Sequence, residues 1–339
     1  MEPYRYYRAQ MDKTERQAYD ALDAGMRTFS PVVRVPRLTP AALSDVLYRL
    51  RLDDARHCCY KEASFRAARD AEHADVLLRY TFEPARARDM RAAVDVRVRK
   101  LCAPARSMDD AGKLRYVHDL LVDSVRYDKL GKSYAHEVIG PLCHGVGVCE
   151  GIAKTAKLLL DELGVETLVV IGEGDETQHG EAGMRHAWNI VRLGGAAYHM
   201  DTTFDLSLTR CGARRYDYYC LSDDEVFCDH RAPVYPVPAC PDSLSYYRTA
   251  RLTAGTPEAL KKLLDRLGKR RGSVFLFQWD APDGSLSMEE IARVCAAFAA
   301  ERGKTARLSC NRTQRVVLFT TAAPEDGGEN GELYEKLPD

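Results

Sequence analysis

Residues 145–164 read GVGVCEGIAKTAKLLLDELG, and this stretch predicts a helix that begins at its cysteine. From Ile152 onward the apolar residues recur at the spacing of one helix face, and Gly164 is a typical helix stop. Cys149 therefore lies in the first turn, where the partial positive charge of a helix N-terminus favours a thiolate. This position predicts a nucleophile, although most cysteines in folded proteins are buried small side chains.

The backbone around Cys149 predicts a place for the oxyanion of an acyl-transfer reaction. The first N–H groups of a helix have no acceptor within the helix, so they can hold a developing negative charge. Gly147 and Gly151 allow a close approach of backbone and substrate. We name Gly147, Val148 and Trp188 as candidates for contacts to the substrate or its oxyanion.

A base for this nucleophile is predicted from a hairpin farther along the chain. Gly194-Gly195 favours a two-residue turn between two strands. That register places Asp201 opposite Trp188 and His186 opposite Thr203. His186 and Asp201 are then diagonal neighbours on one face of the sheet, with Cβ atoms within about 7–8 Å. A carboxylate at this distance can accept the ring N–H of the histidine, which leaves the other ring nitrogen to take a thiol proton.

Three ordered motifs carry a resemblance to a known family. They are GVCEG at 147–151, HAWN at 186–189 and YHMDTTFD at 198–205. Together they resemble the motifs of the transglutaminase-like superfamily, a papain-like group that includes transglutaminases and bacterial cysteine protease-like proteins. The resemblance covers residues 109–240 and is looser in the N-terminal region.

The resemblance implies a catalytic triad of Cys149, His186 and Asp201. It also implies an α+β fold with a papain-like transglutaminase core, in which the cysteine helix packs on an antiparallel sheet. Two positions depart from the family pattern. Ile152 stands where an aromatic residue is frequent, and Phe204 stands where tryptophan is frequent, so the pocket is expected to differ in shape.

The coarse pattern of helices and strands predicts three parts and a tail. Residues 1–108 form an N-terminal α/β region, and residues 109–240 form the transglutaminase-like catalytic domain. Residues 241–322 form a small α/β domain with ferredoxin-like element content, including a strand at 246–252. Residues 174–184 are rich in glycine and predict a mobile loop. The acidic tail at 323–339 is expected to be disordered.

Composition excludes several classes of partner. The 339 residues include 49 Lys and Arg and 50 Asp and Glu, so no bulk charge favours nucleic acid. No run of about 18 apolar residues occurs, so we expect no membrane span. The eleven cysteines have no secretory leader before them, which favours free thiols and a cytoplasmic location.

The leading interpretation is a thiol hydrolase, a cysteine protease or amidase acting on a peptide or protein substrate through an acyl-thioester. One alternative is a transglutaminase-type transfer to an amine. The sequence contains no calcium loop of the EF-hand type, and we favour water as the acceptor. The other alternative is a non-catalytic interaction module with a vestigial triad. Substrate identity and oligomeric state stay open.

The sequence does not favour a metal site. Five residues could form a ligand set: Cys211, Cys220, Cys228, His230 and Cys240. Their spacing lacks the close cysteine pair that is typical of structural zinc sites. We therefore expect no metal and no cofactor.

Overall fold

The computed structural model describes residues 2–67, 70, 72–176, 181–209, 213–269, 272–281 and 285–323. Residues 324–339 of the predicted disordered tail lie outside this part. The chain divides into two compact units, Met1–Ile171 with Ala187–Ala197 and Gly172–His186 with Tyr198–Asp339. The predicted mixture of helix and strand is confirmed, whereas the three-part organisation stays a prediction.

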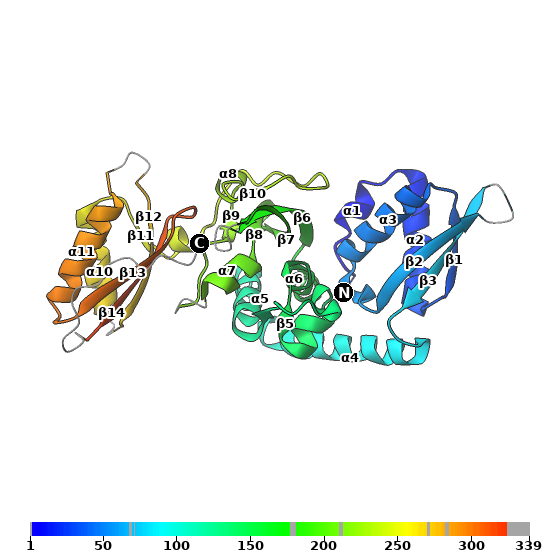
Figure 1. Ribbon diagram of the computed structural model, residues 1–339, viewed down its shortest axis with the longest axis horizontal. Coiled ribbons are helices and arrows are strands. Elements are labelled where there is room, and N and C mark those ends of the chain that lie inside the picture. The colour runs from blue at the N-terminus through cyan, green and yellow to red at the C-terminus, as the bar shows by residue number, and fades with distance from the viewer. Residues whose placement is uncertain are drawn as a thin grey trace. The chain divides into compact units, whose positions relative to one another are not determined.

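The first unit opens with a small α/β layer (Figure 1). Its elements are α1 (Tyr6–Ala9), α2 (Lys13–Thr28), β1 (Val32–Pro36), α3 (Pro40–Asp53), β2 (Tyr60–Ala67) and β3 (His73–Tyr80). The sheet has the antiparallel order β1-β3-β2, and α2 contacts both α3 and β1. Asp12 fixes the start of α2, because its side chain accepts the N–H of Glu15 in a capping box. Buried apolar residues from both helices and the sheet form one core cluster.

The cysteine helix lies in the same unit. α4 (Pro84–Cys102) and α5 (Asp110–Ser124) both contact α6 (Cys149–Leu163). β4 (Arg126–Tyr127) pairs in parallel with β5 (Val146–Gly147), just before α6 begins. Two short turns, Ser133–His136 and Gly140–His144, lie between β4 and β5. Gly164 ends α6 in the left-handed conformation, with φ of 81°, as the sequence predicts.

A five-stranded sheet carries the predicted hairpin. Its strands are β6 (Thr167–Glu176), β7 (Glu181–Leu193), β8 (Ala196–Met200), β9 (Tyr219–Leu221) and β10 (His230–Arg231). They lie in the order β10-β6-β7-β8-β9 (Figure 1). The turn at Gly194-Gly195 has positive φ at both positions, which glycine adopts without strain.

Two expectations in this region are corrected. The glycine-rich stretch 174–184 is not a loop over its described residues, because β6 extends to Glu176 and β7 begins at Glu181. Residues 177–180 lie outside the described part. The second strand of the hairpin ends at Met200, and α7 (Thr202–Thr209) follows at once. Thr203 is therefore helical and is not a strand partner of His186.

The C-terminal elements form a separate sheet with two longer helices and one short one. They are α9 (Tyr246–Thr249), β11 (Thr253–Ala254), α10 (Pro257–Gly268), β12 (Val274–Trp279), α11 (Met288–Ala300), β13 (Thr305–Asn311) and β14 (Val316–Ala322). The strand order is β11-β12-β14-β13, with β11 parallel to β12. Strand and helix alternate twice before a final hairpin, whereas a ferredoxin-like fold has the order βαββαβ. The four strands and two longer helices match the expected element content, but their order differs from that of a ferredoxin-like fold.

The strand predicted at 246–252 is wrong, because residues 246–249 form the short helix α9. Aromatic and β-branched residues favour a strand, but here tertiary packing decides. The ring of Tyr246 stacks on Tyr216, with centroids 4.0 Å apart, and Tyr247 is buried. These contacts hold both tyrosines against the preceding part of the chain.

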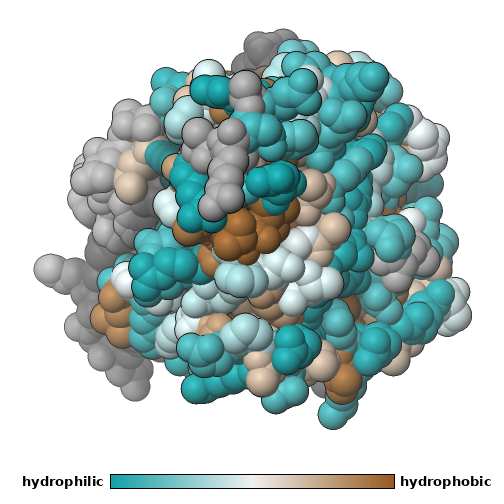
Figure 2. Space-filling model, turned by 90° about the vertical axis from the view of Figure 1, so that its right-hand side faces the viewer, coloured by the Kyte–Doolittle hydropathy of each residue, from teal (hydrophilic) through white to brown (hydrophobic). Residues whose placement is uncertain are grey.

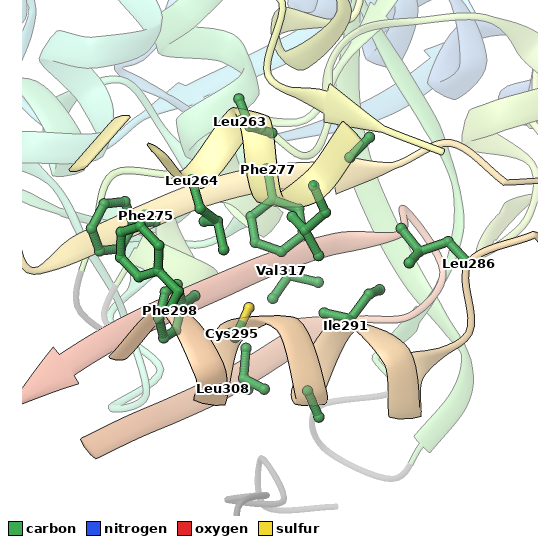
Figure 3. Packing of buried hydrophobic residues seen from close by; sticks show 14 of the residues in the cluster. Leu263, Leu264, Phe275, Phe277, Leu286, Ile291, Cys295, Phe298, Leu308 and Val317 are labelled. Atoms are coloured by element: carbon green, nitrogen blue, oxygen red, sulfur yellow. The ribbon is translucent and has the colours of Figure 1, made fainter. Parts of the chain in front are cut away.

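The C-terminal core is built from both helices and the sheet (Figure 3). Ile291, Cys295 and Phe298 of α11 point toward the strands that carry Phe277 and Val317. All five side chains are buried. This packing gives the C-terminal elements an apolar core of their own.

The face in Figure 2 is mostly hydrophilic, with one compact hydrophobic group and scattered single positions. Isolated apolar residues on a surface are ordinary. Among the described residues, no helix is both long enough and apolar enough to cross a bilayer.

Truncating Phe277 tests the C-terminal core. Phe277→Ala is expected to lower the free energy of unfolding by about 3–5 kcal/mol, because it opens a cavity in a fully buried cluster. Urea denaturation measures the change. Val274→Ala on the same strand is the control, since that side chain is 44% exposed and should cost little. Equal losses in the two variants would contradict this packing.

Candidate functional site

Cys149 is the first residue of α6, and its side chain is partly exposed. The preceding residue, Val148, provides no side-chain cap. The first intrahelical bond runs from the N–H of Ile152 to the carbonyl of Val148. Helix geometry therefore leaves the N–H groups of Cys149, Glu150 and Gly151 without acceptors inside the helix. This end of α6 can stabilise negative charge on a thiolate or an oxyanion.

A close backbone contact fixes the start of α6. A Cβ atom on Gly151 would lie 2.1 Å from the carbonyl oxygen of Ala135, so only glycine fits there. The same carbonyl accepts the N–H of Val148 at 3.0 Å. The backbone N–H of Val148 is therefore directed to Ala135. A contact of Val148 with substrate stays a prediction.

Gly147 also has a packing role. A Cβ atom there would lie 2.8 Å from Cγ of Pro141, and its carbonyl accepts the N–H of Asp128 at 3.0 Å. Trp188, the third candidate for substrate contact, is only 1% exposed. Its neighbour Asn189 donates to the carbonyls of Ala153 in α6 (3.0 Å) and Leu168 in β6 (3.2 Å). The HAWN motif thus joins the cysteine helix to the sheet.

Glu150, next to Cys149, is a charged carboxylate. Burial by itself would raise the pKa of this carboxyl, but Lys154 and His136 bring the pKa below its ordinary value. The ammonium of Lys154 lies 2.8 Å from Oε1 of Glu150. This pairing offsets the negative charge that Glu150 would otherwise place beside the thiol.

His186 and Asp201 form a buried pair in the second unit. Nε2 of His186 lies 2.6 Å from Oδ2 of Asp201, and the side chains are 5% and 1% exposed. The ring of His186 packs against Phe204, with centroids 4.7 Å apart. Gly174 lies against the side chain of His186, because a Cβ atom on residue 174 would be 3.1 Å from Cγ of His186.

The other carboxylate oxygen of Asp201 holds the start of α7. Oδ1 accepts the N–H of Thr203 at 2.8 Å and that of Phe204 at 3.1 Å. Burial would raise the pKa of the Asp201 carboxyl, but His186 and His230 bring the pKa well below its ordinary value. Asp201 is therefore ionised and accepts hydrogen bonds at both oxygens.

His230, which the sequence offers only as a disfavoured metal ligand, is a further member of this site. Its Nε2 lies 2.9 Å from Oδ2 of Asp201, and its Nδ1 lies 2.7 Å from Oδ1 of Asp229. The hydroxyl of Tyr218 donates to Oδ2 of Asp229 at 2.6 Å. The sequence shows an Asp-His dipeptide, but no local pattern relates it to Asp201, which lies 29 positions earlier.

The predicted residues fall in both units. Cys149 belongs to the first compact unit, whereas His186, Asp201 and His230 belong to the second. The catalytic roles assigned to Cys149, His186 and Asp201 stay a prediction.

Residues 99–202 match the model of the transglutaminase-like superfamily. The matched span contains Cys149, His186 and Asp201, and the resemblance inferred from the three motifs is confirmed for it. The chain therefore has a transglutaminase-like core of helices and strands. The superfamily includes enzymes, namely transglutaminases and cysteine protease-like proteins.

Several solved structures are similar to parts of this chain. One is described as a TGase, with 15% identity, a TM-score of 0.28, and coverage of 42% of this chain and 44% of that one. Another is the "Putative Cysteine Protease from Cytophaga hutchinsonii", with 18% identity, a TM-score of 0.24, and coverage of 26% and 30%. Menin, described with its binding site for Mixed Lineage Leukemia protein, has 14% identity, a TM-score of 0.28, and coverage of 86% and 62%. The chain covers less than half of the first two proteins, and no curated protein matches it.

Within the described residues, three clusters bring possible metal-ligand atoms within 4.8 Å of one another. They are His186, Asp201 and His230; His199, Asp223 and Cys240; and Asp23, Asp54 and His57. In each cluster a histidine nitrogen and a carboxylate oxygen are already joined by a direct hydrogen bond. The disfavoured set of four cysteines and His230 is not among these clusters, and Cys211 lies outside the described part.

The dependence of the unfolding free energy on pH below 7 tests whether Asp201 is ionised. A lowered pKa in the folded state stabilises the fold above pH 3.8, and this stabilisation is lost as the pH falls through the folded-state value. Asp201→Asn is expected to cost about 2–4 kcal/mol near pH 7, and this cost should shrink below about pH 4. Urea denaturation between pH 3 and 7 measures the difference.

Asp242→Asn is the matched control, because Asp242 is exposed on the second unit and should cost little at any pH. A cost for Asp201→Asn that stayed constant down to pH 3 would contradict an ionised, hydrogen-bonded Asp201.

Proposed function

We propose that this protein is a thiol hydrolase that cleaves peptide or amide bonds through Cys149, His186 and Asp201. The buried hydrogen bond between His186 and Asp201 carries the proposal. Since the ionised carboxylate only accepts, Nε2 of His186 must carry the shared proton. The neutral ring then has its lone pair on Nδ1, the atom that a general base uses here.

The reaction follows from these residues in two steps. Nδ1 of His186 takes the thiol proton, the sulfur of Cys149 forms a bond to the carbonyl carbon, and N–H groups at the start of α6 hold the oxyanion. The amine leaves with the proton from His186, and an acyl-thioester remains. Water then gives a proton to His186 and its oxygen to the acyl carbon. Release of the acid returns the proton to the sulfur.

Water is the acceptor we favour. The sequence offers no EF-hand calcium loop, and water is far more concentrated than any amine. Transfer to a lysine amine would use the same thioester. The choice between the two depends on whether the site excludes water.

Thiol labelling tests the nucleophile without a known substrate. Cys149 is expected to react with iodoacetamide at pH 6.5 at least about tenfold faster than Cys143 and Cys228. Burial raises the pKa of both control thiols, although both side chains are exposed. Peptide mass spectrometry gives each rate, and His186→Gln should slow Cys149 alone.

A bifunctional reagent tests whether the base reaches the thiol. 1,3-Dibromoacetone joins a sulfur and a ring nitrogen by a three-carbon bridge, so it should link Cys149 to His186. The exposed His136 is the control for a non-specific link. Labelling of Cys149 at the rate of Cys228, together with no link to His186, would overturn the proposed triad.

Product analysis separates hydrolysis from transfer. A peptide library that includes glutamine residues is incubated with the protein and a primary alkylamine. New carboxylates, from peptide cleavage or side-chain deamidation, are expected in the presence and absence of the amine, and Cys149→Ala should produce none. Products that carry the mass of the amine in place of new acids would assign acyl transfer instead.

A further inference from the structure

The Asp201 carboxylate is shared between two histidine rings that are not equivalent. His186 is 5% exposed, whereas the His230 side chain is fully buried. The two rings lie 5.4 Å apart between centroids, and both direct Nε2 to the same oxygen of Asp201. A mechanism that uses only Cys149, His186 and Asp201 leaves the second ring without a role.

The groups around His230 determine its protons. Asp201 is an ionised acceptor, so Nε2 of His230 must be the donor in their bond. At the other side of the ring, Nδ1 meets the Asp229 carboxylate, whose second oxygen already accepts the hydroxyl of Tyr218. Burial raises the pKa of Tyr218 well above its ordinary value, so that hydroxyl keeps its proton and donates it.

An imidazole held between two carboxylates is favoured as a cation. Burial would lower the pKa of His230, but the hydrogen bonds to Asp201 and Asp229 raise it above its ordinary value. The titratable groups in contact with the ring include these two carboxylates, Tyr218 and His186. His199 lies farther off, and burial together with the charge of His230 lowers its pKa. The neighbouring Arg231 is paired with Asp175.

We propose that His230 is a positioning residue for the Cys149–His186 reaction, which holds Asp201 against Nε2 of His186 and places a buried positive charge beside it. This inference rests on the proposed function. It assigns His230 two effects on His186. The anchor keeps the carboxylate oriented, and the charge offsets part of the attraction of Asp201 for a proton on His186.

The two effects have a measurable consequence for His186. An ionised carboxylate beside a histidine favours its protonated form, whereas a general base near neutrality has to give that proton up. The positive charge of His230 beside the same carboxylate weakens the attraction of Asp201 for a proton on His186. His230 therefore helps to keep Nδ1 of His186 able to accept a proton at neutral pH.

His230→Gln separates the charge from the anchor, because the carboxamide keeps an N–H donor and carries no charge. Histidine NMR of the full chain, with isotope-labelled histidine, follows the titration of His186. The midpoint for His186 is expected to rise by roughly one pH unit in this variant. Asp229→Asn keeps the ring but removes one of its two carboxylates, and it should give a smaller rise.

His199→Gln is the matched control. His199 is also fully buried, and its Nε2 lies 2.8 Å from Oδ1 of Asp223. It belongs to the same compact unit, and no hydrogen bond joins it to Asp201 among those described. Its replacement should cost comparable stability and should leave the His186 midpoint unchanged. Thermal unfolding and circular dichroism verify that each variant is folded.

The outcomes are distinct. An unchanged His186 midpoint in folded His230→Gln, or an equal rise in His199→Gln, would overturn the inference. So would stoichiometric zinc in the purified protein that is lost in His230→Gln, because the ring would then be a metal ligand. Failure of the proposed function has a different signature, since Cys149 would label slowly in the wild-type protein whatever happens to the His186 midpoint.

Discussion

The Asp201 carboxylate is the constraint on which the second unit depends. Its two oxygens accept four hydrogen bonds, two from backbone N–H groups at the start of α7 and two from histidine rings. Burying a carboxylate costs free energy unless the group is hydrogen-bonded. The four donors therefore have to be in place together. The side chain of Asp201 thus determines where β8 ends, where α7 starts and how His186 is oriented.

The cysteine helix depends on a second constraint of a different kind. No side chain caps α6, so the end that carries Cys149 is available to an anion. The position of that end is instead fixed by packing. Gly151 lies against the carbonyl of Ala135, which in turn holds the N–H of Val148. The helix start is thus closely packed and has no side-chain cap, a combination that suits charge stabilisation.

Sequence reasoning succeeds here where the signal is local. The 3.6-residue pattern and Gly164 predict α6, and Gly194-Gly195 predicts the hairpin turn, because each depends on neighbouring residues alone. The hydrogen bond between His186 and Asp201 joins two residues that the predicted turn makes neighbours. The second strand of the hairpin does not continue through Thr203 as predicted, because the capping bonds of Asp201 start a helix there.

What sequence reasoning misses depends on distant contacts. His230 reaches Asp201 through strand β10, which pairs with β6 at Gly174, far from it in the chain. No periodicity reports such a pairing. The short helix at 246–249 is missed for the same reason, because the stacking of Tyr246 on Tyr216 outweighs the strand preference of its residues.

The support of His230 extends into the C-terminal elements of the same unit. The side-chain amide of Asn311 in β13 donates to Oδ2 of Asp217 at 3.0 Å and reaches the Tyr218 hydroxyl at 3.4 Å. Arg215 pairs with both oxygens of Asp217, at 2.9 and 2.7 Å. Removing one partner of such a buried ion pair is strongly destabilising, because it leaves an uncompensated charge. A continuous set of polar contacts therefore joins the hairpin β13–β14 to Asp229, His230 and Asp201. Through Asn311, the C-terminal elements therefore support the residues that hold the second histidine.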